Sequence, residues 1–359
     1  MDTHLVYRRS LEAASHCLNT GDKVLIGLSG GPDSVALARI LAAAAPGLGI
    51  SLGLAHVNHG CRGADARADE AFSRELARGL QLECHTLRLD VPELAKRRGL
   101  SLEEAGRNAR YGYFDTLVRE KGYTHVATGH HRDDHVEQIL MNLIRGSGPS
   151  GLTGIPMVRN GLCAVPVLRL LLGSTKAEIL DFLGALGQAH CRDATNSDTQ
   201  YRRNAVRHDL IPFIETHFNP RITDALDRLS QILSLEEDFM VRESEAALAA
   251  CRRSGRGITL SISALMGYHE AMVHRVLRLA LDQTKSNLKR ITLAHVRDIC
   301  RLADQGHPGK QLDLPGQIRV YRLRNRISIC REDRPLREIG REEKLRKAAR
   351  KAAGEARKS

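Results

Sequence analysis

The chain has 359 residues, with 54 lysines and arginines against 42 aspartates and glutamates, and a formal net charge of +12. A hydrophobic content of 42% supplies real cores and excludes wholesale disorder, and the length favours two or three domains. No window approaches the roughly 18–20 apolar residues of a membrane helix. Residues 1–10 lack the apolar core of a signal peptide, so we expect a cytoplasmic protein without a membrane partner.

The positive charge and the cysteines narrow the class of partner. The charge points to a polyanion, most simply a nucleic acid, although solubility alone is the alternative. Aromatic residues make up 4% and tryptophan is absent, which does not favour a platform of stacked single-stranded bases. The eight cysteines are isolated, without a C-x-x-C pair, so a zinc ribbon, an iron–sulfur cluster or a redox pair is not expected.

The first 150 or so residues alternate short apolar runs with helical patterns. Expected strands cover 23–28, 50–57, 83–89 and 124–128, and expected helices cover 34–45, 64–80, 101–121 and 133–144. Strands that alternate with helices predict an α/β fold with a doubly wound, mainly parallel sheet covered on both faces. Unusual polar segments, 29–34, 56–62 and 129–134, follow three of the strands. Because ligands bind beyond the carboxyl ends of such strands, we expect these segments to form one site.

The chain after residue 146 has a different character. A Gly- and Pro-rich connection at 146–161 precedes a helix at 175–186, with Thr175 and Glu178 as a possible capping box, and a polar, basic stretch at 191–207. Further helices are expected from about 220 to 250, at 263–281 and at 293–304, followed by a β-hairpin or small sheet at 310–330. We expect domains at 1–215 and 216–330, the second mostly helical with a small β element, and a basic, flexible tail at 331–359.

The segment at 29–34, hereafter the phosphate loop, reads S-G-G-P-D-S between an expected strand and an expected helix. Its two glycines let the backbone turn sharply, the proline suits a first helical turn, and both serines can donate hydroxyls to one anion. The helix dipole adds positive charge there, whereas an aspartate suits a phosphate site only if it faces a metal or an attacking group. An ordinary capped turn is the alternative. The loop lacks the Walker A pattern and resembles the PP-loop of the N-type ATP pyrophosphatases.

Five further segments carry a more specific resemblance. They are H-V-N-H-G-C-R-G at 56–63, the run 101–111 with R-N-A-R-Y, A-T-G-H-H-R-D-D-H-V-E at 127–137, R-G-S-G-P-S-G-L-T-G-I at 145–155, and the run 193–207 with R-R-N-A-V-R. With the phosphate loop, this ordered set resembles the tRNA(Ile)-lysidine synthetase family over roughly 20–220. Residues 290–330 are similar to that family's substrate-binding domain. Longer members carry a further C-terminal domain, and we expect this chain to be a short form without it.

The resemblance implies a reaction and its partners. ATP, with Mg²⁺, adenylates the C2 oxygen of the wobble cytidine in the CAU anticodon of an isoleucine tRNA, and the ε-amine of free lysine displaces AMP. The product is lysidine. The same resemblance makes 1–215 the catalytic PP-loop domain and 216–330 the domain that binds tRNA. A homodimer would help a short chain to span a tRNA.

The resemblance also assigns residues to the nucleotide. The expected nucleotide-binding residues are Ser29, Gly30, Gly31, Pro32, Asp33, Ser34, His56 and Gly129. Asp33 is the expected metal ligand, because Mg²⁺ takes one or two carboxylates and completes its shell with water and phosphate oxygens. Arg107 would meet the nucleotide or the activated base, with a surface salt bridge as the alternative. His130 could meet ATP or the metal.

A second set is expected to bind the other substrates. Asp134 and Glu137 are three residues apart at a helix start, so both carboxylates can face one spot. By resemblance they hold the lysine, although an acidic first turn also simply complements the helix dipole. The expected tRNA contacts are Arg110, Arg203, Asn204 and Arg207, and the expected catalytic set is Asp33, Arg107, His130, Asp134 and Glu137. His135 departs from the family pattern, which leaves the detail of the lysine pocket open.

Other functions compete with this one. Another PP-loop chemistry, tRNA thiolation or a small-molecule amidation, would use the same phosphate loop, but paired cysteines are missing and a small substrate does not need a charge of +12. A metal hydrolase could use the H-H-R-D-D-H run at 130–135. A non-catalytic RNA-binding relic is the remaining alternative, against which the intact acidic and phosphate-loop residues argue.

Overall fold

The computed structural model describes residues 4–60, 64–191, 202–342, 345 and 348–349. The chain divides into two compact units, Met1–Ser234 and Leu235–Ser359, and the division falls inside helix α11 (Ile222–Cys251). The domain limits expected at 215 and 330 stay predictions.

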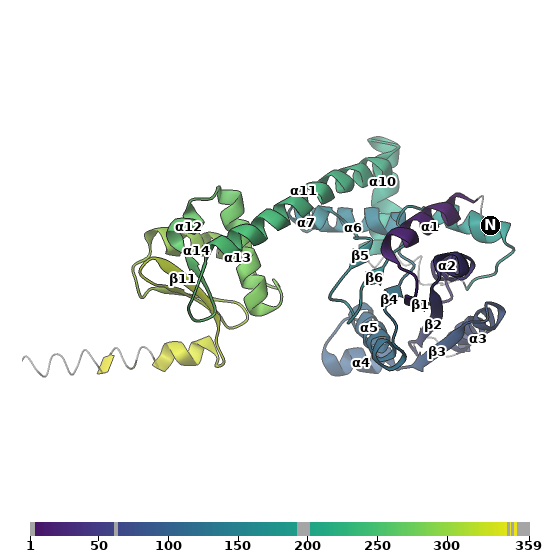
Figure 1. Cartoon of the computed structure of the whole chain (residues 1–359), viewed down its shortest axis with the longest axis horizontal. Helices are drawn as coiled ribbons and strands as arrows, with labels where there is room; N and C mark the ends of the chain where they lie inside the picture. The colour runs from purple at the N-terminus through teal and green to yellow at the C-terminus, as the bar shows by residue number, and fades with distance from the viewer. Residues whose placement is uncertain (1–3, 61–63, 192–201, 343–344, 346–347, 350–359) are drawn as a thin grey trace, which may run out of the picture. The chain divides into compact units, whose positions relative to one another are not determined.

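The first unit contains a six-stranded sheet of order β3–β2–β1–β4–β6–β5 (Figure 1). Its strands are β1 (Lys23–Gly27), β2 (Ser51–Asn58), β3 (Glu83–Arg88), β4 (His125–Ala127), β5 (Val158–Arg159) and β6 (Val167–Leu168). The neighbouring strands from β3 to β6 run parallel, and β5 runs antiparallel to β6 at the edge. The four expected strands are confirmed to within one residue at each end.

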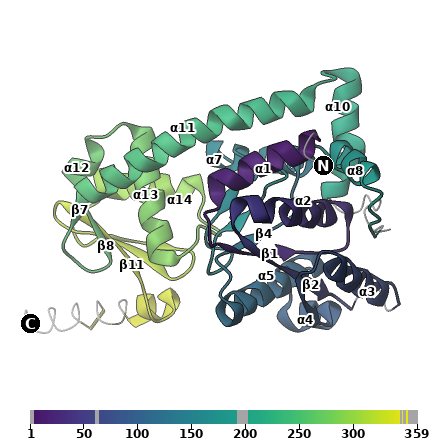
Figure 2. The same cartoon turned by 45° about the vertical axis from the view of Figure 1, so that its right-hand side comes forward.

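The first unit also contains a set of helices, several of which cover the two faces of this sheet. They are α1 (Leu5–Cys17), α2 (Pro32–Leu48), α3 (Ala64–Gly79), α4 (Val91–Arg98), α5 (Leu102–Lys121), α6 (Arg132–Ile144), α7 (Pro149–Leu152), α8 (Lys176–Ala185), α9 (Arg202–Ala205), the π-helix η2 (Val206–Leu210) and α10 (Ile211–His217). Val24 and Ile26 of β1 pack in a core with α1, α2 and α8, whereas Leu25 between them packs in a second core with α5. Helices α1 and α2 accordingly lie on one side of the strands and α5 on the other (Figure 2). The doubly wound α/β fold is confirmed.

Local sequence signals explain where several helices begin. The Ser101 hydroxyl accepts the Glu104 N–H at 3.2 Å and starts α5. At α8 the capping box is complete: Thr175 Oγ1 accepts the Glu178 N–H at 3.2 Å, and Glu178 Oε2 accepts the Thr175 N–H at 2.7 Å. The connection at 146–161 differs from the expectation, because it contains α7 and β5. These elements of four and two residues are too short for any periodic pattern to reveal them.

The strand order creates one special position in the sheet. From β1 the chain moves to β2 and β3 on one side, and then returns to β4 and β6 on the other. The carboxyl ends of β1 and β4 therefore flank a topological switch point, where ligands bind in doubly wound folds. The segments expected to converge follow β1, β2 and β4, three strands that are direct neighbours. For the described residues, 29–34, 56–60 and 129–134, the convergence on one edge is confirmed.

The second unit pairs helices with an antiparallel sheet. It contains α12 (Ile262–Met266), α13 (Glu270–Lys285), α14 (Leu293–Gln305) and the strands β7 (Arg252–Arg253), β8 (Ile258–Ser261), β9 (Gln311–Leu314), β10 (Ile318–Arg322) and β11 (Arg326–Arg331), in the order β7–β8–β11–β10–β9. Its core joins residues such as Leu277 of α13 to Val320 and Ile329 of the sheet. The helix expected at 263–281 is two helices, α12 and α13, and residues 336–342 of the expected tail are helical. No described helix has the length and apolar character needed to cross a membrane.

Candidate active site

The phosphate loop leaves β1 at the switch point and opens α2. Gly30 has a φ of +88°, in the left-handed region that favours glycine, and a Cβ there would lie 3.0 Å from the Sγ of Cys191. Ser34 closes the loop, because its hydroxyl donates to a loop carbonyl at 2.9 Å and accepts the Ser29 N–H at 3.1 Å. The two serine hydroxyl oxygens lie 3.1 Å apart. Hydroxyls and free N–H groups thus gather at the N-terminus of a long helix, an arrangement that binds anions.

The two strands that flank β1 place Gly129, after β4, and His56, in β2, beside the phosphate loop. A Cβ on Gly129 would lie 2.9 Å from the Ser34 nitrogen, so only glycine lets the end of β4 come this close. His56 is buried in β2, and its Nδ1 lies 3.0 Å from the Leu28 carbonyl oxygen. Burial lowers the pKa of His56, which keeps the ring neutral. Its Nε2 is buried without a hydrogen-bond partner among the described residues, as expected of an acceptor that awaits a ligand.

Asp33 forms an ion pair with Lys176. The Nζ of Lys176 donates to the two Asp33 carboxylate oxygens at 2.7 and 2.8 Å, and the Lys176 N–H donates to Asp133 Oδ2 at 2.7 Å. Lys176 is the first residue of α8, whose start is fixed by its capping box. Both side chains of the Asp33–Lys176 pair are partly exposed, so the pair can exchange partners at modest cost.

His131 connects Asp33 to a second group of charges. Its Nε2 lies 3.8 Å from Asp33 Oδ1 and 3.6 Å from Asp134 Oδ2, and its Nδ1 lies 3.1 Å from Asp133 Oδ2. Burial lowers the pKa of His131, but the nearby carboxylates of Asp133, Asp134 and Asp33 outweigh burial and raise the pKa above its ordinary value. A buried imidazole is thus held among three carboxylates at the switch point.

Asp134 and Glu137 lie one turn apart on α6 and contact two arginines. Arg203 donates from Nε to Glu137 at 2.7 Å and from Nη2 to Asp134 at 3.0 Å. Arg207 donates from Nε to Glu137 at 2.6 Å and from Nη2 to Asp134 at 3.4 Å. The Glu137 side chain is 0% exposed and that of Asp134 is 15% exposed. The residues expected to hold lysine and those expected to hold RNA therefore contact one another. We call these four side chains the acid–arginine cluster.

His130 is close to both groups of charges and stays neutral. Its Nδ1 lies 3.0 Å from Thr128 Oγ1. Burial, helped by the positive charges of Arg169, Arg203 and Arg110, lowers the pKa of His130 to about 4 although Asp134 opposes the shift. At neutral pH this ring therefore adds no positive charge beside Asp134.

Arg107 and Arg110 both lie on α5, as expected. The Arg107 guanidinium lies 5.1 Å from the centre of the Tyr111 ring, and it pairs with no carboxylate of a described residue. Burial and the charge of Arg110 lower the pKa of His59, which follows β2, to about 4. Arg110 is thus close to the end of β2, and its charge also reaches His130 after β4. On the same helix, the Arg107 guanidinium has no ion-pair partner among the described residues.

The remaining expected residues lie at the border of the site. Asn204 belongs to α9, between Arg203 and Arg207. His135 fastens α6 in place: its Nδ1 accepts the Ile155 N–H at 2.9 Å, and its Nε2 lies 2.7 Å from Ser230 Oγ. Residues 61–63 and 192–201, which carry parts of the family resemblance, lie outside the described residues. Among the described residues, no group of three or more His, Cys, Asp or Glu side chains is arranged to hold a metal ion.

Lys176 and Arg169, like His131, were not among the expected site residues. Lys176 pairs with Asp33 from the first position of α8. Arg169 directly follows β6, is 2% exposed, and donates from Nη1 to the Pro156 carbonyl at 2.7 Å. Its Nε has no partner among the described residues. The rule applied to the other strands, that a polar residue at a carboxyl end faces the ligand, would have found Arg169 had β6 been recognised.

Comparison with known proteins places this site in a class. A family model described as PP-loop domain matches residues 3–214, and one described as TilS substrate binding domain matches residues 260–327. Among solved structures, the U34-tRNA thiolase NcsA from Methanococcus maripaludis aligns with a TM-score of 0.53 and 19% identity, over 64% of this chain and 78% of that one, and shares the fold. Fold and phosphate loop together define a PP-loop protein.

Curated relatives identify the family within that class. The tRNA(Ile)-lysidine synthase of Clostridium perfringens (strain 13 / Type A) is 36% identical over 302 residues, which cover 84% of this chain and 63% of the relative. That of Geobacter sulfurreducens is 35% identical over 334 residues, which cover 92% of this chain and 70% of the relative. This chain belongs to the tRNA(Ile)-lysidine synthase family, as its sequence predicted. It spans about 63% of the length of the Clostridium perfringens relative.

Proposed function

We propose that this chain is a ligase that joins free lysine to C2 of the wobble cytidine in a CAU-anticodon isoleucine tRNA, through an adenylated cytidine, and releases AMP and pyrophosphate. One observation carries the proposal: contacts run without a break from Asp33 in the phosphate loop through His131 to the acid–arginine cluster. An anion site for a nucleotide and a carboxylate site for an ammonium group are thus direct neighbours. The names of the family relatives supply the substrate.

The phosphate loop suits ATP, and Asp33 suits Mg²⁺. The loop offers N–H groups and two hydroxyls to phosphate oxygens, and His56 Nε2 offers a buried acceptor. Asp33 gives a carboxylate, the ligand type that Mg²⁺ takes in ones or twos beside phosphate and water. Bound Mg²⁺ would supply positive charge to the phosphates. The Lys176 ammonium would then leave Asp33 and neutralise a phosphate oxygen, so that the loop binds the pyrophosphate that departs.

The acid–arginine cluster suits lysine only after its arginines move. Two carboxylates and two guanidinium groups sum to zero formal charge, so the cluster as it stands has little attraction for an ammonium group. Arg203 and Arg207 are partly exposed and would find new partners in the phosphates or the base of the tRNA. Asp134 and Glu137 would then hold the lysine. This exchange makes lysine binding depend on tRNA.

The bond changes follow from this placement. The unprotonated ε-amine forms a C–N bond at C2, the C2–O bond breaks, and that oxygen leaves with AMP. The amine gives up its protons to solvent or to a carboxylate of the cluster. Neutral His130 adds no positive charge beside the carboxylates that would hold the lysine. Arg107, unpaired on α5 among the described residues, would hold the adenylated base or its phosphate.

A tracer experiment tests the proposal. The chain is incubated with ATP, Mg²⁺, labelled lysine and an unmodified isoleucine tRNA with a CAU anticodon. We expect label in acid-precipitable RNA, with one AMP and one pyrophosphate per lysine. A tRNA with the anticodon changed to GAU is the control and should stay unlabelled. ATP–pyrophosphate exchange without incorporation of lysine would contradict the proposal.

Sulfur transfer is the nearest alternative, and one cysteine permits a comparison with it. Cys191 lies beside the phosphate loop, with its N–H on the Gly30 carbonyl at 2.9 Å. Burial, with Asp69, raises the pKa of Cys191 to about 12. A thiol held protonated at neutral pH is a poor nucleophile. This chemistry favours lysine nitrogen over sulfur. A homodimer stays part of the proposal, as a means to span the tRNA, and sedimentation equilibrium would test it.

A further inference from the structure

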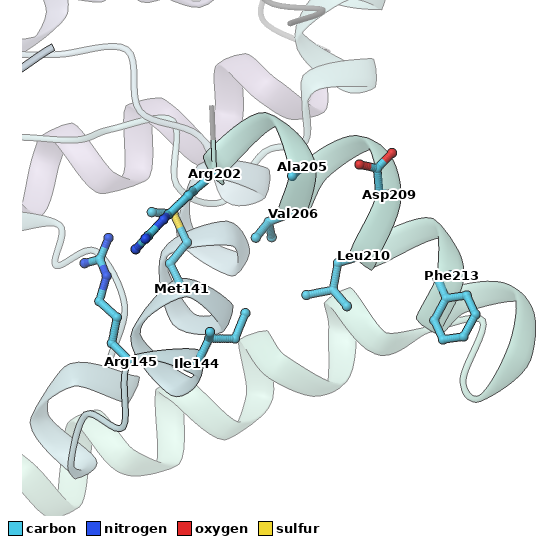
Figure 3. A pocket seen from close by; sticks show the side chains of 9 residues that line it. All are labelled: Met141, Ile144, Arg145, Arg202, Ala205, Val206, Asp209, Leu210 and Phe213. Carbon is cyan, nitrogen blue, oxygen red and sulfur yellow. The ribbon is translucent and has the colours of Figure 1, made fainter. Parts of the chain in front are cut away.

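A pocket of about 540 Å³ lies on the first unit, beside the acid–arginine cluster but outside the residues assigned to lysine, ATP or the reacting base. Figure 3 shows its lining, which comes from α6, α9, η2 and α10. Met141, Ile144, Val206, Leu210 and Phe213 make it largely apolar, and Ala205, Arg145, Arg202 and Asp209 complete it. Its volume is that of a site for a small organic group.

The pocket and the acid–arginine cluster share helix α6. Glu137, Met141 and Ile144 are four and seven residues apart on α6, so they lie on one face of that helix. Met141 is about one turn, roughly 6 Å along the axis, beyond Glu137. On the other wall, Arg203 and Arg207 contact the cluster, and the adjacent residues Arg202 and Val206 line the pocket. The pocket therefore continues the active site along α6.

The lining fits a planar, weakly polar group with a negative charge at one end. The guanidinium groups of Arg145 and Arg202 lie together at one end of the pocket, and Phe213 lies towards the other (Figure 3). Both arginines are exposed, and neither has an ion-pair partner in the part of the chain that the structure describes. Phe213 is 53% exposed, although an aromatic side chain gains from being covered. A nucleotide has this chemistry: a base that packs on apolar and aromatic groups, and a phosphate that arginine binds.

We propose that this pocket binds an unstacked nucleotide of the anticodon loop, next to the base that reacts. The proposal rests on the proposed function. An enzyme that acts on one base must take it out of the stack, and the neighbouring bases are then exposed. Because the pocket lining begins about one turn of α6 beyond Glu137, a nucleotide next to the reacting one could reach it. The base would pack against Phe213 and Ile144, and Arg145 and Arg202 would bind its phosphate.

Direct binding to RNA hairpins tests this pocket. The probe is a hairpin with the CAU anticodon in its loop, together with versions that lack the base on either side of the cytidine. We expect Phe213→Ala in the full chain to weaken binding of the intact hairpin about tenfold. One of the two base-less hairpins should bind the wild-type chain as weakly as the intact hairpin binds Phe213→Ala. Its affinity should not fall further when the Phe213→Ala chain replaces the wild type. Arg145→Gln with Arg202→Gln should weaken all hairpins alike and reduce the salt dependence. Phe239→Ala and Arg119→Gln, exposed positions outside the pocket, are the matched controls.

Three outcomes decide the matter. Pocket variants that bind the intact hairpin as the wild type does would overturn the proposal. Variants that leave RNA binding intact but abolish self-association in sedimentation would also overturn it and make the pocket a protein-docking surface. A wild-type chain that shows the Phe213-dependent binding without transferring lysine would support the pocket and contradict the proposed function.

Discussion

Glu137 and Glu70 are two buried glutamates that each pair with two arginines, in different surroundings. Glu70 on α3 is 3% exposed and accepts from Arg88 Nε at 2.7 Å and from Arg74 Nη2 at 3.0 Å. Glu137 on α6 is paired as closely with Arg203 and Arg207. Close pairing of a buried carboxylate with arginine is therefore present twice in the first unit. It marks the need to neutralise a buried charge, not a functional site.

The surroundings separate the two glutamates. Glu70 also accepts from Asn58, and Arg88 reaches it from solvent, with 70% of its side chain exposed. The Glu137 arginines come from 66 and 70 residues away and are only about one third exposed. A second carboxylate, Asp134, shares them and touches the histidine beside the phosphate loop. An active site is indicated where two carboxylates share the same partly exposed arginines and lie beside another binding element. Substitutions at the two glutamates and at the phosphate loop should therefore differ in their effect on activity.

Asp33→Ala should have the largest effect. It removes the carboxylate that connects the phosphate loop to His131, and we expect lysine transfer to fall about a thousandfold or more. Affinity for tRNA should stay within about twofold, because phosphate contacts elsewhere dominate it. Single-turnover transfer and filter binding on the same preparation would measure both. Loss of tRNA affinity in parallel with transfer would show that Asp33 acts through the fold.

Glu137→Gln and Glu70→Gln are a matched pair. The first leaves Arg203 and Arg207 short of a negative charge and removes one of the two carboxylates that we propose hold lysine. We therefore expect lysine transfer to fall about a hundredfold, mainly through the KM for lysine. The second should change transfer by less than about threefold. Thermal unfolding serves as the control, because both variants remove a buried carboxylate and should lose comparable stability. Equal losses of transfer in the two variants would remove the distinction between the glutamates.

Lys176→Met tests the exposed ion pair of the site. Without the ammonium group, a phosphate of ATP lacks one charged hydrogen bond, and we expect the Kd for ATP with Mg²⁺ to rise about tenfold. Stability should change by less than about 1 kcal/mol, because the pair with Asp33 is partly exposed. Calorimetric titration with a non-hydrolysable ATP analogue would measure the affinity. An unchanged Kd would mean that Lys176 neutralises Asp33 and does not contact ATP.

The smallest expected effect is on the pH dependence of stability, and it comes from Glu70. The hydrogen bond from Arg88, which outweighs burial, lowers the pKa of Glu70 from 4.5 to about 2. A carboxylate whose pKa is lower in the folded state stabilises the fold above the unfolded pKa, and that contribution disappears as the pH falls from about 4.5 to about 2. We expect wild type to exceed Glu70→Gln by about 1–2 kcal/mol in unfolding free energy at pH 7. Urea titrations should show this difference shrinking below pH 4.5. If the difference in unfolding free energy between wild type and Glu70→Gln grew on acidification, the lowered pKa of Glu70 would be contradicted.

Features that depend on short stretches of the chain could be predicted from the sequence. Strand limits, the capping residues Ser101 and Thr175, and the meeting of three polar segments at one sheet edge all follow from periodicity, capping and the rules of parallel sheets. The phosphate loop and the family motifs were also readable. The roles of individual site residues stay predictions.

Pairings between distant residues were not readable. Asp33 and Lys176 are 143 positions apart, and no pattern in either segment indicates that they touch. The acid–arginine cluster shows the same limit, because Asp134 and Glu137 predict a cation site and Arg203 and Arg207 predict an anion site, and only three-dimensional packing shows them paired. Arg169 was missed because β6 has only two residues, too few for a strand pattern.

The central claim, that this sheet edge makes lysidine, can be tested by mass analysis of the modified nucleoside. Wild-type chain is incubated with ATP, Mg²⁺, lysine and CAU-anticodon isoleucine tRNA, and the RNA is digested to nucleosides. We predict that the wobble cytidine gains the mass of lysine less one water, and that Asp33→Ala yields unmodified cytidine. Cytidine of unchanged mass with the wild-type chain, while ATP is consumed, would contradict the account.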